Sequence, residues 1–279
     1  MQTNDWLRAE DYAEPRCLLC DEPHGAKPKP KMIPKQRVME KFDEYTSRND
    51  YAGAERHMLY WLEEARLGMD LQGQFQIQNE LMGLYRKTAQ EEKAFSSMDA
   101  ALALAQEMHI EDQVSGATAF LNAATVCNAF RHPERSLPLF ARARTVYEAQ
   151  LPPKDPRMGG LYNNMALTLA ALGKYDAADD LYRRALDVMA DAPNGALEQA
   201  ITYLNMADSV YLRLGAQQAE PQIDELLGVA LALLEDEKLP RNGYYAFVCE
   251  KCAPTFLDYG WKAYGEELKE RAREIYERA

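Results

Sequence analysis

The chain of 279 residues lacks any apolar run long enough to cross a bilayer, which requires about 18 to 20 residues. Its first residues, MQTNDWLRAEDYAEPR, have neither a basic start nor an apolar core, so they do not resemble a secretory signal. We therefore expect a cytoplasmic protein that does not associate with membranes.

An excess of basic residues is also missing. The formal net charge is −12 at pH 7. Nucleic-acid binding requires a concentrated basic face that neutralises phosphates, and this net charge argues against such a partner, although a local basic patch remains possible. DNA and RNA are therefore not expected as main partners.

Sequence patterns typical of catalysis are absent. There is no GxSxG, no P-loop, no GxGxxG after a strand and no HExxH. The four histidines stand in no motif with a nucleophile or a second metal ligand, and they are His24, His57, His109 and His132. We predict that the protein is not an enzyme and needs no cofactor.

Only five cysteines are present, and four of them form two CxxC pairs. Cys17 and Cys20 lie near the N-terminus, whereas Cys249 and Cys252 lie 232 residues further along the chain. Four thiolates could hold Zn²⁺, and a zinc- or redox-responsive protein is therefore one alternative. The competing interpretation is that Cys249 and Cys252 pack inside a helical core as small hydrophobic residues.

Residues 1–34 differ in composition from all that follows. They contain five prolines, and lysines alternate with prolines in the segment KPKPKMIPK. Prolines at this density are incompatible with a continuous helix and favour extended backbone. We predict an extended tail over 1–34 and a separate helical domain over 35–279.

From residue 35 onward, apolar residues recur at spacings of three and four, which predicts amphipathic helices. The stretch 159–189 shows the pattern best, with two helices joined by a tight turn at Gly173 and Lys174. The fifth unit has a longer predicted turn, over 215–221, before a helix at 223–234. The other predicted hairpins cover 35–66, 72–107, 115–149 and the segment from 242 onward.

Three columns of residues keep one register over three hairpins, each separated by 42 residues. The first column consists of small side chains, at Ala94, Ser136 and Ala178. The other two columns are Met98, Phe140 and Tyr182, and Ala101, Ala143 and Ala185. Unrelated hairpins would drift out of register, so we predict a true internal repeat.

Small and bulky positions alternating around a glycine-containing turn resemble the tetratricopeptide repeat, and the 42-residue period is similar to the kinesin-light-chain variety. One hairpin cannot bury its own apolar face, so neighbouring units are required. The resemblance implies an all-α fold, a right-handed α-solenoid of about six hairpins. It also implies a protein-interaction scaffold whose first helices line a concave groove.

An asparagine recurs on successive first helices, at Asn79, Asn122, Asn164 and Asn205. In the groove these amides could donate to and accept from the backbone of an extended peptide. Alternatively, they could connect neighbouring helices across the stack. The remaining residues predicted to line the groove are Arg86, Lys87, Asn128, Asn163, Asp208 and Tyr211.

The sequence therefore predicts a non-enzymatic module that binds a peptide or protein segment. A regulator that senses a peptide and acts by sequestering another protein is a further alternative.

Overall fold

A computed structural model describes residues 31–278, and all regular structure within that range is α-helical. Successive helices pack into six antiparallel hairpins, as the repeat predicted. The twelve helices are α1 (Lys35–Ser47), α2 (Tyr51–Leu67), α3 (Leu71–Lys87), α4 (Glu91–Glu107), α5 (Val114–Ala129), α6 (Pro133–Gln150), α7 (Pro156–Ala171), α8 (Tyr175–Met189), α9 (Gly195–Leu214), α10 (Ala216–Leu234), α11 (Gly243–Asp258) and α12 (Lys262–Arg278). None of these helices is both long and apolar enough to pass through a bilayer.

The repeat columns form the packed interior of the hairpins. Ala94, Ser136 and Ala178 are each fully buried. Their small side chains let paired helices approach closely, and the bulky column of Met98, Phe140 and Tyr182 fills the adjoining space. The register predicted from the sequence is thus confirmed.

Aspartates fix the start of α2 and α3. The Asp50 carboxylate accepts a hydrogen bond from the Gly53 backbone N–H, and Asp70 accepts one from Gly73, both at 2.8 Å. Such caps satisfy N–H groups that have no partner in the first helical turn. Asp70 also accepts a hydrogen bond from the Ile33 backbone N–H at 3.0 Å, which attaches residues just before α1 to the turn between α2 and α3.

The predicted turn over 215–221 is wrong. Helix α9 ends at Leu214 and α10 already begins at Ala216, so a single glycine with a φ of 75° makes the connection. Pro221 lies inside α10. Its missing N–H leaves the carbonyl of Gln217, in the first turn of α10, without a helical partner.

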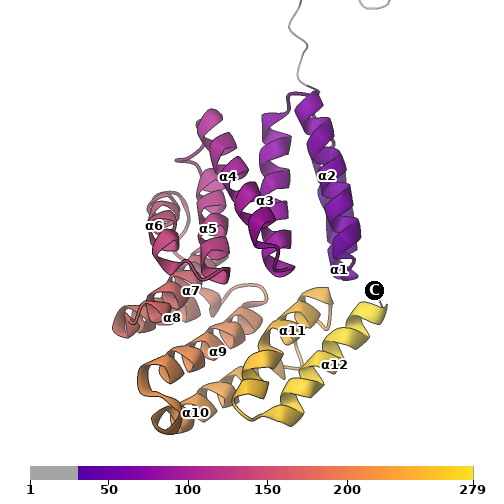
Figure 1. Cartoon of the computed structure of the whole chain (residues 1–279). Coiled ribbons are helices and arrows are strands. Elements are labelled where there is room, and N and C mark those ends of the chain that lie inside the picture. The colour runs from indigo at the N-terminus through magenta and orange to yellow at the C-terminus, as the bar shows by residue number, and fades with distance from the viewer. Residues whose placement is uncertain (1–30, 279) are drawn as a thin grey trace, which may run out of the picture.

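The hairpins curve so far that the last one lies beside the ends of the first (Figure 1). Lys87, at the end of α3, reaches Glu250 of α11 at 3.8 Å. Its ammonium also lies 4.8 Å from the ring centre of Tyr51 in α2 and 5.0 Å from that of Phe247 in α11. Side chains from opposite ends of the chain therefore join the array into a ring.

Candidate functional site

Curvature of the array forms a cavity of about 550 Å³, open to solvent, between α3, α5, α7 and α11. We call it the basic cavity because three cations line it: Arg86, Arg131 and Lys251. The amides of Asn128 and Asn164 contribute polar groups to the same lining. Among the described residues, no carboxylate lines it.

The side chains of Arg86 and Lys251 reach solvent, but the surrounding protein atoms displace much of the water around them. This desolvation lowers the pKa of both Arg86 and Lys251. Glu198 partly counteracts the effect on the pKa of Lys251, whereas the nearby charge of Arg86 lowers it further. The cavity thus concentrates positive charge in a chain whose formal net charge is −12, and it is suited to an anionic group.

Asn128 is held in place by a hydrogen-bond network. Its amide donates to the Thr168 hydroxyl at 2.5 Å, and its oxygen accepts from the Ser136 hydroxyl at 3.0 Å. Asn164 donates one amide N–H to the carbonyl of Gly160 in its own helix at 2.8 Å. Both predicted groove asparagines therefore line the cavity with their orientation fixed by neighbouring groups.

The other asparagines of the predicted groove form two pairs across the stack. Asn122 donates to the amide oxygen of Asn79 at 3.4 Å, and Asn205 donates to that of Asn163 at 3.0 Å. Asn79 and Asn122 line a different cavity, of about 540 Å³, between the second and third hairpins. The structure thus does not bring all the predicted asparagines to one surface, and peptide binding by them stays a prediction.

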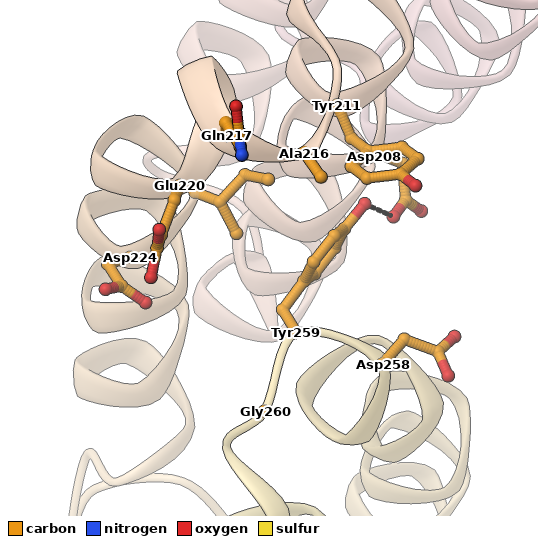
Figure 2. A pocket seen from close by; sticks show the side chains of 10 residues that line it. Asp208, Tyr211, Ala216, Gln217, Glu220, Asp224, Asp258, Tyr259 and Gly260 are labelled. Atoms are coloured by element: carbon orange, nitrogen blue, oxygen red, sulfur yellow. Dashed lines mark hydrogen bonds between the residues drawn. The ribbon is translucent and has the colours of Figure 1, made fainter.

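Asp208 and Tyr211 lie in a third cavity, of about 690 Å³, between the fifth and sixth hairpins. Figure 2 shows the Tyr259 hydroxyl directed at the Asp208 carboxylate, to which it donates at 2.9 Å. Burial raises the pKa of Asp208, against the opposing effect of that hydrogen bond. Carboxylates dominate the rest of this lining, through Glu220, Asp224 and Asp258. Its charge is opposite to that of the basic cavity.

Comparison with known proteins adds a family assignment. A family model described as "Tetratricopeptide repeat" matches residues 157–233, from the start of α7 to the end of α10. The chain carries tetratricopeptide repeats over these residues. No curated protein sequence matches the chain.

Two solved structures resemble the tetratricopeptide array at low sequence identity. Kinesin light chain TPR-like repeats from Podosopora anserina align with a TM-score of 0.49 and 16% identity, covering 72% of this chain and 94% of that one. BtubC (BKLC) from P. vanneervenii aligns with a TM-score of 0.47 and 16% identity, covering 88% of this chain and 91% of that one.

The cysteines of the sixth hairpin are buried within the core of α9 to α12. Burial raises the pKa of Cys249 to about 11 and that of Cys252 to about 12, which disfavours the thiolates that zinc requires. Cys17 and Cys20 lie outside the described residues. The shared zinc site therefore remains a prediction, and it would require α11 to expose two core side chains.

Two cations of the basic cavity were not among the predicted groove residues. Arg131 lies in a turn, outside the first helices to which the predicted groove was assigned. Lys251 lies between Cys249 and Cys252, 165 positions after Arg86, and no local pattern connects it with α3. The structure separates the predicted basic pair as well, since Arg86 lines the cavity whereas Lys87 contacts the last hairpin.

Proposed function

We propose that this tetratricopeptide array is a non-enzymatic cytoplasmic scaffold that binds an acidic segment of a partner protein in the basic cavity. The repeat fold itself is generally a protein-interaction module. The observation that carries the proposal is a lining with Arg86, Arg131 and Lys251 and no described carboxylate, inside a strongly acidic chain.

The cavity supplies the chemistry that an acidic peptide needs. A guanidinium can hold a carboxylate through two parallel hydrogen bonds, and Lys251 provides a compact charge opposite it. Asn164 has a second amide N–H and an oxygen beyond its bond to Gly160, which can contact a peptide backbone. The fixed orientation of Asn128 lowers the entropy lost when a ligand binds.

Fluorescence anisotropy with labelled peptides tests the proposal. A glutamate-rich peptide should bind, whereas a lysine-rich peptide of equal length should not. The double variant Arg86→Ala, Lys251→Ala should weaken binding at least about tenfold, because hydrogen bonds to charged groups contribute about 1.5–3 kcal/mol each. Affinity should also fall as salt is raised.

Arg183→Ala serves as the control. Arg183 is exposed on α8, and within residues 31–278 its one ion pair is with Asp180, one turn away, so its loss should leave the affinity unchanged. Equal binding by the cavity variant and the wild type, or a preference for the lysine-rich peptide, would refute the proposed function.

A further inference from the structure

The junction between the two ends of the array is adjacent to the basic cavity. Arg86 and Lys87 are consecutive at the end of α3, and Glu250 and Lys251 are consecutive in α11. Arg86 and Lys251 line the cavity, whereas Lys87 and Glu250 meet at 3.8 Å outside its lining. Across this junction, Lys87 and Glu250 therefore attract each other, whereas Arg86 and Lys251 repel each other.

The contacts of Lys87 connect three helices. Its ammonium lies near the rings of Tyr51 in α2 and Phe247 in α11, at 4.8 and 5.0 Å. A cation between two aromatic rings is attracted by both, and Glu250 adds a favourable charge. Lys87 thus links the first two hairpins to the sixth.

Elsewhere in the junction, mainly polar and charged side chains line a cavity. This cavity of about 380 Å³ separates the turn at Arg48 and Asn49 from the residues of the last hairpin, which include Tyr276. Dense apolar packing would hold the two ends together permanently, whereas polar side chains around a cavity form a junction that can open.

We propose that the ring of hairpins opens and closes, and that the contacts of Lys87 hold it closed; we call this role of Lys87 the clasp. Closure then brings Lys251 to the basic cavity. The second part of this inference rests on the proposed function, because it concerns affinity for an acidic ligand. An anion between Arg86 and Lys251 replaces their repulsion by attraction, so ligand binding and closure favour each other.

Spin-label distance measurements on the full chain, without ligand, test the clasp. Labels attached through non-canonical residues at Tyr60 of α2 and Glu266 of α12 occupy exposed positions and leave the native cysteines unchanged. Lys87→Ala should lengthen or broaden the distance distribution, and Lys87→Glu should do so more strongly. The double variant Lys87→Glu, Glu250→Lys should recover part of the short distance, since it restores the ion pair.

Lys93 offers a matched control. It also pairs with a carboxylate, Glu55 at 2.7 Å, and lies 5.3 Å from the ring centre of Tyr85, but all its partners belong to the first two hairpins. Lys93→Ala should therefore leave the distance unchanged. An unchanged distance in both Lys87 variants would overturn the clasp.

Titration with the labelled glutamate-rich peptide then tests the coupling. Lys87→Ala should weaken binding about as much as Lys251→Ala, roughly tenfold, although Lys87 does not line the cavity. Opening without loss of affinity would overturn the coupling while the proposed function stands. Absence of binding to the wild type would refute the proposed function, and the ligand-free distances would still decide on the clasp.

Discussion

At the scale of single residues, the asparagines serve two different purposes that their spacing alone does not distinguish. Asn163 is only 8% exposed and its amide oxygen accepts from Asn205 of the next hairpin. Asn164, one residue later, donates to a carbonyl of its own helix and lines the basic cavity. Position on the helix surface, and not membership of the column, decides which amide supports the stack and which is available to a ligand.

Substitution of Asn205, the partner of Asn163, and of Asn164 should therefore change the stability of the protein by different amounts. Asn205→Ala leaves the buried Asn163 amide without its donor and should lower the free energy of unfolding by about 1–3 kcal/mol. Asn164→Ala should change it by less than about 0.5 kcal/mol, because alanine favours the helix and no partner in another hairpin loses its bond. Urea unfolding followed by circular dichroism measures both. Equal destabilisation by the two variants would contradict the distinction.

At the scale of the helical hairpin, the turns repeat with the same period as the core. Ala89, Arg131, Gly173 and Gly215 follow one another at intervals of 42 residues, and all four have positive φ, between 55° and 75°. A side chain in this conformation strains the backbone, whereas glycine adopts it freely. The repeat therefore places a positive φ at this turn in each of these units, but only two of them have glycine there.

Exchanging the residues of this column should change stability in both directions. Gly173→Ala should destabilise the protein by about 1 kcal/mol through backbone strain alone, since a Cβ there meets nothing within 4 Å. Ala89→Gly should stabilise it by up to about 1 kcal/mol, less the entropy that glycine adds to the unfolded chain. Thermal unfolding followed by circular dichroism provides the comparison. Destabilisation by Ala89→Gly would show that the strain is negligible.

Hairpins were the most predictable level of this structure, because they depend on local periodicity. The buried columns through Phe140 and Ala143 were recognised from spacing alone. The turn before α10 was predicted to extend to Pro221, whereas the helix begins at Ala216 and contains that proline in its interior, where local sequence disfavours it. In the candidate site, Arg86, Asn128 and Asn164 lie on first helices and were predicted, whereas Arg131 lies in a turn.

At the scale of the whole molecule, curvature determines which distant residues meet. The small rotation between successive hairpins accumulates along the array, and the resulting contact between Lys87 and Glu250 joins residues 163 positions apart. No single repeat encodes that rotation, so neither the ring nor the contribution of Lys251 to the basic cavity could be predicted. The acidic composition left a local basic patch possible but gave no indication of where it would lie.

The distribution of buried residues predicts that the ring has two cooperative parts. Two core clusters share α5 and so link α1 to α8, whereas the fully buried residues of the third cluster all come from α9 to α12. Phe256 belongs to this third cluster and contacts the rings of Trp261 and Tyr264. Elements that share a core tend to open together.

Phe256→Ala should therefore loosen the last two hairpins selectively. The loss of a buried aromatic side chain costs about 3–5 kcal/mol, and hydrogen exchange should accelerate in α9 to α12 while α3 to α6 keep their protection. Phe140→Ala, at a fully buried position of the middle cluster, should instead accelerate exchange in α1 to α8 while α9 to α12 keep their protection. Mass spectrometry of exchanged peptides resolves these segments. Uniform acceleration in both variants would show one cooperative unit, in which the ends could not separate without global unfolding.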